Sequence, residues 1–571
     1  MPGGLLNLVA KGNQNILIHG NPTKTFFKST YSKHTNFGLQ KFRIDYEGQR
    51  SLQLNSETEI KFKVPRYGDL LMDIYLVIDL PDIWSPIIRN NDNEICPYEF
   101  KWIKNIGTNL IKEVKFSIGG QIIQSFTGTY LKNVVERDFD ESKKQLFNLM
   151  TGNTDDINNP AKFFQEKNQF KYPSCFNFSG SEKTVLPSIN SKRLYIPINI
   201  WFTLMSKMAF PLVSLQYNEL QIDFKLRAVN DLYVIRDINN PNFNDYNETP
   251  YIRNFSDNLY KFLQPPPSHN ININSNFSSL YPNTFNSWNE NIHILATYGF
   301  LDNDEVQVFT SKPQQYLIKE FREYNFYELV GANTLEIETN GLVCNFMFYF
   351  QRNDIKECNE WSNYSNWKYD NIIPEYPQRL KTDFMKNGGN YNVLFNNLNF
   401  QEEENIYYNP LSSNYIYFTK NYDISNNVNY KLINQKNIMN EFGILLDGKY
   451  RENIFDQGVY NYVDYYIRSS GKGKEGLYFY NFGLNTNPYS MQPNGAINLA
   501  KFNRVEFQTN LISPPLNNSA QVKIICDEDD IVLGIEKTPN NLYEYTFNLT
   551  VQEERYNMLQ FINGNAQLMF A

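Results

Sequence analysis

The stretch GNPTKTFFKSTYSKHTNF, residues 20–37, follows a short apolar leader and decides the fold that we expect. Its Asn-Pro pair predicts a turn, because proline fixes its own φ and moves the preceding residue out of the helical region. After the turn, Phe27, Ser29 and Tyr31 alternate with residues that face the other way. This period of two is typical of a strand with two differently solvated faces. We therefore expect a first strand here, preceded by an arm that belongs to no core.

The length and composition favour a chain of several domains built from strands. At 571 residues the chain is too long for one ordinary core, so we expect two or three domains. Aromatic residues make up 16% of the chain, and they suit the pleated surface of a sheet. The net charge is -8. Because coating nucleic acid needs a basic surface, we expect no direct contact with nucleic acid.

The first fifty residues are more basic than the rest of the chain. They hold seven Lys or Arg residues and two acidic residues. Lysines of this kind can protect an exposed strand edge against mispairing. The alternative is a face turned toward an anionic surface such as a lipid membrane. Both interpretations stay open.

The cysteines and the leader indicate folding in a reducing compartment. The five cysteines are scattered and none forms a Cys-x-x-Cys pair, which argues against a disulfide scaffold. The leader lacks the charged start and the long apolar run of a signal peptide. No stretch approaches the roughly 20 apolar residues that a membrane span needs. We expect a soluble protein made in the cytosol.

Alternating runs recur along the first half of the chain. Ile118-Gly119-Gly120-Gln121 predicts a hairpin, because a type I′ turn needs positive φ at both central residues. Residues 130–139 are the first plausible helix, with apolar residues at helical spacing. About eight short strands with long loops predict an antiparallel sandwich, and a jelly roll is a common arrangement of eight strands. The other expected strands cover residues 60–64, 70–80, 193–202 and part of 212–232.

The second half repeats this pattern after a break. Residues 236–287 are rich in Asn, Pro and Ser and predict a linker with little regular structure. Strand patterns restart at Trp288 and recur at residues 342–350 and 476–482. Residues 352–440 are rich in Asn and Tyr, and we interpret them as an inserted set of surface loops. Such an insertion costs little, because loop-closure entropy grows only with the logarithm of length.

Several motifs, in matching order, resemble the major capsid proteins of large eukaryotic double-stranded DNA viruses. The leader and the 20–37 stretch resemble the family's amino terminus. Residues 492–500, QPNGAINLA, resemble its Gln-Pro-Ser-Gly-x-x-Asn-Phe-Ser box, although Ala500 replaces the final serine. The remaining similar segments are Pro65–Leu70, Leu80-Pro81, Trp102–Gly107, Ile118–Gln121, Pro211–Glu219, Tyr298–Glu305 and Tyr556–Ala566.

The resemblance implies an all-β fold of two tandem eight-stranded antiparallel jelly rolls, with long loops and a few short helices. We place the N-terminal arm at residues 1–24 and the first jelly roll at 25–235. The linker at 236–287 leads to the second jelly roll at 288–571, which carries the 352–440 insertion.

The resemblance also implies a function in assembly. A major capsid protein forms homotrimers, and these pseudo-hexagonal capsomers tile the icosahedral shell of the virion, the outer capsid, after assembly in the host cytoplasm. Its partners are neighbouring capsomers, minor capsid or cement proteins and penton proteins. We expect an assembly arm that tethers the capsomer to inner-shell proteins or to an internal membrane, formed by Gly3, Gly4, Leu5, Leu6, Leu8 and Val9.

The sequence offers no pattern typical of an enzyme. The four histidines lack partners at metal-ligand spacing, and we expect His34 to hold a buried hydrogen bond. Residues 471–476 lack the Gly-Lys-Ser/Thr ending of a phosphate loop. The acidic runs at 402–404 and 527–530 are interpreted as solvated loops, with weak calcium sites as the alternative. We expect no catalytic, metal-binding or cofactor-binding residues and no cofactor.

Two other functions remain open. A double jelly-roll scaffold protein of an immature virion would share the fold but form a temporary lattice. A β-sandwich carbohydrate-binding protein or glycosidase would present a concave aromatic face with convergent carboxylates, whose spacing cannot be read from sequence.

Overall fold

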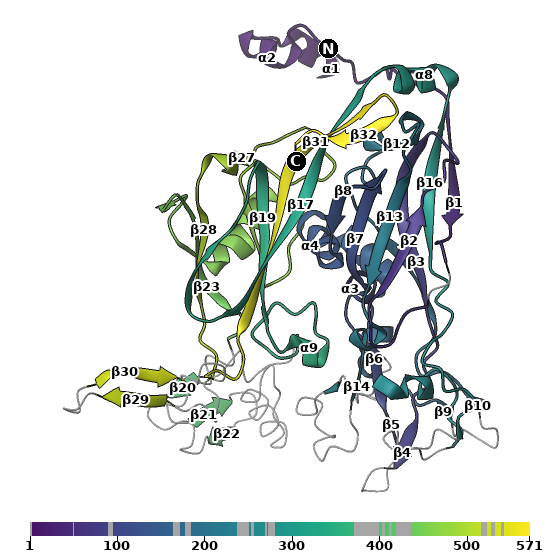
Figure 1. The fold of residues 1–571 in the computed structure, drawn as a ribbon. Helices are drawn as coiled ribbons and strands as arrows, with labels where there is room; N and C mark the ends of the chain where they lie inside the picture. The colour runs from purple at the N-terminus through teal and green to yellow at the C-terminus, as the bar shows by residue number, and fades with distance from the viewer. Residues whose placement is uncertain are drawn as a thin grey trace.

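The structure is a computed structural model in which two β-sandwiches stand side by side (Figure 1). The N-terminal arm leaves from one end, and small hairpins such as β4–β5 and β29–β30 gather at the other (Figure 1). The structure describes residues 3–48, 51–89, 95–163, 172–177, 184–236, 251–252, 256–268, 271, 280–370, 399–401, 406–409, 414–417, 435–490, 492–515, 522–526, 532–537 and 542–570.

The first sandwich has two sheets. Its strands are β1 (Phe37–Ile44), β2 (Thr58–Lys63), β3 (Leu70–Leu80), β7 (Ile111–Ile118), β8 (Gln121–Phe126), β11 (Lys192–Pro197), β13 (Leu220–Leu226) and β16 (His293–Leu301). One sheet has the order β1-β16-β3-β11, with β12 (Phe210–Pro211) beside β3, and the other has the order β2-β13-β7-β8. Strand β2 illustrates the sequence logic, because Ile60 and Phe62 enter the core while Lys61 and Lys63 face solvent.

The second sandwich repeats this arrangement. Its strands are β17 (Gln314–Leu329), β18 (Ala332–Glu336), β19 (Leu342–Arg352), β23 (Met439–Leu446), β24 (Lys449–Tyr450), β26 (Leu477–Asn481), β28 (Val505–Leu511) and β31 (Phe547–Ile562). The sheets have the orders β17-β31-β19-β26 and β18-β28-β23-β24. Short strands β25 (Phe455–Asp456), β27 (Ile497–Asn498) and β32 (Asn565–Leu568) extend them.

Both sandwiches have the same topology. In each, one sheet holds the first, eighth, third and sixth strand in chain order, and the other holds the second, seventh, fourth and fifth. Eight antiparallel strands divided in this way between two packed sheets form a jelly roll. The prediction of an all-β fold with two tandem eight-stranded jelly rolls is confirmed.

The boundary between the jelly rolls differs from the predicted one. We assigned residues from 288 onward to the second jelly roll, but β16 lies between β1 and β3 in the first. Strand alternation shows that two faces exist and not which sheet a strand joins. The chain therefore passes from the first to the second jelly roll through helix α8 (Asn303–Ser311).

The prediction of a first strand within residues 20–37 is wrong except at its last residue, because β1 begins at Phe37. Phe26 and Phe27 are 86% and 99% exposed, so neither packs on a neighbouring strand. Alternation permits a strand, but a strand also needs a partner. The expectation for His34 is wrong as well: the residue is exposed, and its Nδ1 lies 2.7 Å from the carbonyl oxygen of Thr35.

Two local predictions in the first jelly roll are confirmed. Strands β7 and β8 form the expected hairpin, with φ of 57° at Gly119 and 85° at Gly120. The helix expected at residues 130–139 is α4 (Gly128–Asp138). Its first turn is capped by the Thr127 side chain, which accepts a hydrogen bond from the backbone nitrogen of Tyr130.

The predicted linker and insertion are partly buried. In the predicted linker, residues 236–287, Phe262 is fully buried. The centre of its ring lies 5.6 Å from that of Phe100 in the first jelly roll. In the predicted insertion, residues 352–440, α9 (Ile355–Cys358) and the segment after it lie between the jelly rolls. There Trp361 Nε1 donates to the carbonyl oxygen of Asp231 at 2.9 Å, so the surface-loop prediction is wrong for this part. Most of the rest of the insertion lies outside the described residues.

The remaining elements are short. In the arm they are α1 (Gly3–Val9), η1 (Asn13–Asn15) and α2 (Ile16–His19). In the first jelly roll and its loops they are β4 (Ile87–Arg89), β5 (Ile95–Pro97), β6 (Glu99–Trp102), α3 (Ile106–Leu110), α5 (Glu141–Thr151), α6 (Asp155–Asn158), α7 (Pro160–Phe163), β9 (Phe176–Asn177), β10 (Thr184–Val185), η2 (Ser206–Met208), η3 (Leu212–Ser214), η4 (Val229–Asp231), β14 (Tyr233–Arg236), β15 (Tyr251–Ile252) and η5 (Ser256–Lys261). In the second they are β20 (Asn399–Gln401), β21 (Ile406–Asn409), β22 (Asn414–Tyr417), the π-helical η7 (Val459–Val463), α13 (Asp464–Arg468), η8 (Leu499–Lys501), β29 (Val522–Cys526) and β30 (Val532–Lys537).

Candidate assembly surfaces

Helix α4 joins the two jelly rolls. It follows β8 in the first jelly roll and packs against the outer face of the β17-β31-β19-β26 sheet in the second. The Tyr130 ring lies 4.3 Å from that of Phe321, centre to centre, and its hydroxyl donates to Glu554 Oε1 at 2.8 Å. One helix turn further, Asn133 Nδ2 donates to Gln552 Oε1 at 2.9 Å. The helix therefore fills this sheet face from within the same chain.

A buried ion cluster lies at the end of this helix. Arg137 Nη2 contacts Asp138 Oδ2 at 2.7 Å and Glu554 Oε1 at 2.9 Å, and all three side chains are at most 2% exposed. Its Nη1 donates to Asn345 Oδ1 at 3.0 Å. Burial alone would raise the pKa of Glu554, but the Arg137 guanidinium outweighs it and lowers that pKa to about 2. The cluster therefore connects α4, which belongs to the first jelly roll, with strands β19 and β31 of the second.

A second polar cluster lies deeper between the jelly rolls. Asp370 Oδ2 accepts from Lys104 Nζ at 3.4 Å and from Lys474 Nζ at 3.1 Å. Lys132 Nζ lies 4.8 Å from the ring centre of Tyr364, and within the described ranges it has no hydrogen-bond partner. Burial lowers the pKa of Lys132 to about 7. The burial of the Lys132 side chain at the junction therefore lowers the stability of the folded state.

The predicted arm residues lie together on one exposed helix. Leu5 and Leu6 of α1 are 47% and 54% exposed, and Leu8 and Val9 are 66% and 71% exposed. Gly3 and Gly4 begin the helix, which has no buried residue. The sequence reasoning missed α2, whose Leu17 is 90% exposed. The sequence feature that could have predicted α2 is the apolar run Ile16–Ile18, which directly follows a polar stretch. The arm is thus two short helices with uncovered apolar side chains.

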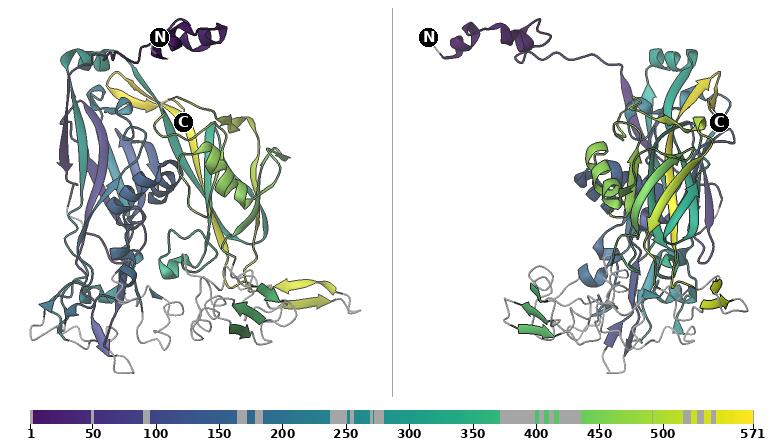
Figure 2. Two further views of the ribbon diagram at one scale, coloured as in Figure 1. Left: turned by 180° about the vertical axis from the view of Figure 1, so that it is seen from behind. Right: turned by 90° about the vertical axis from the view of Figure 1, so that its left-hand side faces the viewer.

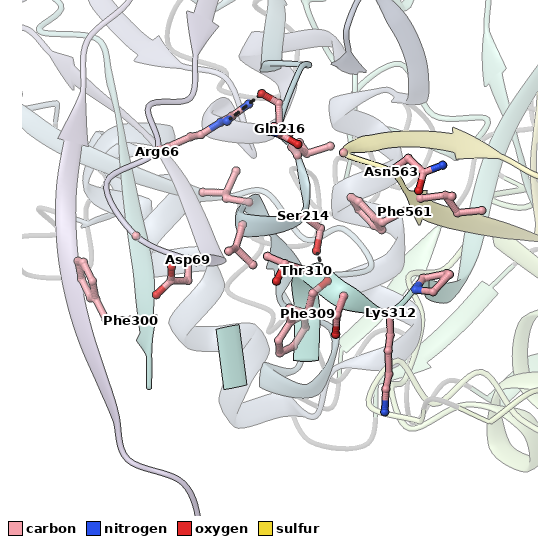
Figure 3. Close-up of a pocket in the computed structure, with 18 of the residues that line it drawn as sticks. Arg66, Asp69, Ser214, Gln216, Phe300, Phe309, Thr310, Lys312, Phe561 and Asn563 are labelled. Carbon is pink, nitrogen blue, oxygen red and sulfur yellow. Dashed lines mark hydrogen bonds between the residues drawn. The ribbon is translucent and has the colours of Figure 1, made fainter. Parts of the chain in front are cut away.

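A cleft of about 600 Å³ lies at the end of the molecule from which the arm departs (Figure 3). Five segments line it: the β2–β3 turn, the loop around η3, the end of β16 at Phe300, the end of α8 and the β31–β32 turn. Arg66 Nη2 fixes one wall by donating to the carbonyl oxygen of Asn218 at 2.8 Å, and Ser214 Oγ donates to that of Phe309 at 3.2 Å. Because these segments are far apart in the sequence, no local sequence pattern predicts the cleft.

Within the described ranges, no three His, Cys, Asp or Glu side chains come together in a way that could hold a metal ion. The described helices also lack the length and apolar character that crossing a bilayer requires. The Gly-rich loop at 471–476 packs against α4, where Gly471 N donates to the carbonyl oxygen of Arg137 at 2.8 Å. The acidic runs at 402–404 and 527–530 and His269 lie outside the described residues.

One family model and several known proteins are similar in sequence to this chain. Residues 25–263 match the family model described as "Major capsid protein N-terminus". A 237-residue segment is 31% identical to capsid protein 1 of Acanthamoeba polyphaga mimivirus and covers 42% of this chain and 36% of that protein. A 343-residue segment is 25% identical to the major capsid protein of Phaeocystis pouchetii virus and covers 60% of this chain and 56% of that protein. The chain therefore spans only about a third to just over half of the length of these two relatives.

Solved structures share the fold over nearly the whole chain. The crystal structure of PBCV-1 VP54, fitted into a reconstruction of the virophage Sputnik, matches with a TM-score of 0.57 at 16% identity and covers 96% of this chain and all of that one. The Faustovirus major capsid protein matches with a TM-score of 0.57 at 10% identity, and the match covers 98% of this chain and 96% of the Faustovirus chain. Residues 25–263 thus match the model of the major capsid protein N-terminus, and the resemblance of the chain to the double jelly-roll major capsid proteins of large eukaryotic DNA viruses is confirmed.

Proposed function

We propose that this chain is the major capsid protein of a large eukaryotic DNA virus and that three copies form one capsomer. The observation that carries the proposal is the repeated strand order of the two jelly rolls within one chain. Three copies arranged around a threefold axis would present six similar sandwiches. Such a ring has a nearly hexagonal outline and can tile a shell.

The polarity of the molecule supports a direction for this assembly. The arm lies at one end, and small hairpins gather at the other (Figure 1). We place the hairpin end outward, and the arm inward against inner-shell proteins or an internal membrane. Uncovered leucines on α1 suit either partner, because burying apolar surface drives both kinds of contact. Neighbouring capsomers, minor capsid proteins and penton proteins complete the shell in the host cytoplasm.

The proposed role is structural and needs no chemistry. The buried carboxylate of Glu554 is paired with Arg137, so it stabilises the junction between the jelly rolls. The assembly contacts carry the function. Contacts within a trimer should be large, on the order of 2,000–5,000 Å² or more, and contacts between trimers smaller and more polar.

Light scattering on the purified full-length protein in neutral buffer tests the proposal. A particle of three times the 67.2 kDa of one chain, with a hexagonal outline by electron microscopy, is the expected result. A folded particle with the mass of one chain would contradict it. A second measurement separates capsid from scaffold: the protein should be abundant in purified mature virions, and its restriction to immature particles would assign it to a temporary lattice.

A further inference from the structure

The two jelly rolls differ in what covers their equivalent outer sheets. In the second, α4 fills the face of the β17-β31-β19-β26 sheet. In the first, the β1-β16-β3-β11 sheet carries an open groove of about 440 Å³ on the face opposite its core. Leu39, Lys41, Met72 and Tyr75 line the groove, and the loop at 203–206 forms a wall. The groove thus lies on the same strands of the repeat that α4 covers in the other jelly roll.

The equivalent helices of the second jelly roll have one face that no described residue covers. Helices η7 and α13 connect the fifth strand to the sixth there, which is the place of α4 in the first jelly roll. Tyr460 and Tyr465 anchor them in the core. On the opposite side, Tyr462, Val463, Tyr466 and Ile467 form an apolar ridge, with Tyr466 90% exposed. Figure 2 shows these helices, in green, standing out from the second sandwich.

We propose that the ridge on η7 and α13 of one copy docks into the groove on the β1-β16-β3-β11 sheet of the next copy. The inference rests on the proposed trimer and names the surfaces that form it. One chain already makes the equivalent contact internally, through α4 and the second jelly roll. The contact between chains would therefore resemble the contact within each chain, and the two would alternate around the ring.

The proposed contact has a direction. The ridge and the groove are different surfaces, so each copy gives its ridge to one neighbour and its groove to the other. Such a head-to-tail contact produces a closed ring when its rotation closes. Exposed tyrosines suit the centre of such an interface, since large aromatic side chains provide much of the binding energy at protein contacts.

Charge substitutions on the two surfaces test the inference. Tyr466→Glu on the ridge and Leu39→Arg in the groove should each weaken association on the order of 30-fold per contact, the effect of losing one interface hot spot. Light scattering at micromolar concentration should then detect single chains. Tyr31→Glu is the matched control, because Tyr31 is 89% exposed on the arm, and it should leave the particle of three chains intact. The double variant Tyr466→Glu/Leu39→Arg places opposite charges at every contact and should restore part of the association.

The outcomes separate this inference from the proposed function. If the wild-type protein is a single chain, the trimer itself is refuted. If the wild-type protein is a trimer and both single variants remain trimers, the ridge and the groove are not its interface, although the capsid function stands. Thermal unfolding of each variant checks the fold, and an unfolded Tyr466→Glu protein leaves Leu39→Arg, on the other surface, to decide.

Discussion

The two jelly rolls share one strand order, but among the described residues only the second has its outer sheet covered by a helix of the same chain. The covered sheet belongs to the second jelly roll, and its contact with α4 combines the fully buried pair of Arg137 and Glu554 with the ring contact of Tyr130 and Phe321. The uncovered sheet belongs to the first and retains apolar and aromatic side chains such as Leu39 and Tyr75 around an open groove. A repeated fold therefore does not imply repeated surfaces. What differs is whether the partner of a sheet is part of the same chain.

The junction should respond most strongly to loss of its guanidinium. Arg137→Ala removes the closest cation from buried Asp138 and Glu554 and leaves Glu554 only Lys319, whose Nζ lies 3.9 Å from its Oε2. Removing one partner of a buried ion pair costs about 3–5 kcal/mol. Chemical denaturation should show this loss in the free energy of unfolding. Arg193→Ala is the control, because Arg193 pairs with Asp79 on an exposed part of the first sheet and its loss should change little. Equal effects of the two substitutions would mean that the junction is not held by this cluster.

Acid should weaken the junction more than it weakens the uncovered sheet. The folded pKa of Glu554 is about 2, and its ordinary value is 4.5. A lowered pKa stabilises the folded state above about pH 4.5, and this contribution is lost as the pH falls toward 2. The loss amounts to about 3 kcal/mol at most, from 1.36 kcal/mol per pKa unit.

Unfolding free energies between pH 6 and pH 3 measure this effect. Glu554→Gln should flatten the pH dependence, whereas Glu47→Gln, in an exposed pair with Lys63, should leave it unchanged. A wild-type slope that survives Glu554→Gln would place the acid sensitivity elsewhere.

Replacing Lys132, which has no hydrogen-bond partner among the described residues at the junction, should stabilise the protein. Lys132 is buried and its pKa is lowered to about 7, so the folded state binds fewer protons than the unfolded state between pH 7 and pH 10. Stability therefore rises with pH in this window. Lys132→Met should raise the free energy of unfolding by about 1 kcal/mol at pH 7, because an apolar side chain replaces a buried charge.

The melting temperature at pH 7 and pH 9 checks this prediction. The rise between the two values should disappear in Lys132→Met and persist in the control Lys63→Met, whose side chain is exposed. A destabilised Lys132→Met protein would show that the contact of Lys132 with Tyr364 outweighs its desolvation.

The sequence predicts local elements better than their partners. The hairpin at Gly119-Gly120 follows from adjacent glycines at positive φ, and β2 follows from strict alternation. Strand β16 has an equally clear pattern, but its position between β1 and β3 depends on residues more than 200 positions away. The stretch at 26–31 alternates as well, yet it pairs with no strand in the described ranges and forms none itself.

The assembly surfaces show the same limit. The apolar leader is visible as a run of leucines, and its residues are exposed in the structure as an assembly arm requires. The groove is not visible in this way, because β1, β3 and the loop at 203–206 each contribute only part of it. The pairing of Arg137 with Glu554, far apart in the chain, likewise leaves no trace in either local sequence.

The arm should matter least for stability and most for assembly beyond the trimer. None of residues 3–15, the part of the deleted segment that the structure describes, has a buried side chain. The free energy of unfolding should therefore change by less than about 0.5 kcal/mol when residues 1–15 are deleted. The particle of three chains should also survive, because the proposed ridge and groove lie elsewhere. The yield of complete virus particles should nevertheless fall, since uncovered residues such as Leu5 and Leu8 would lose their inner-shell or membrane partner. An unchanged particle yield would show that the uncovered apolar surface of the arm, unlike that of the ridge, has no partner in the shell.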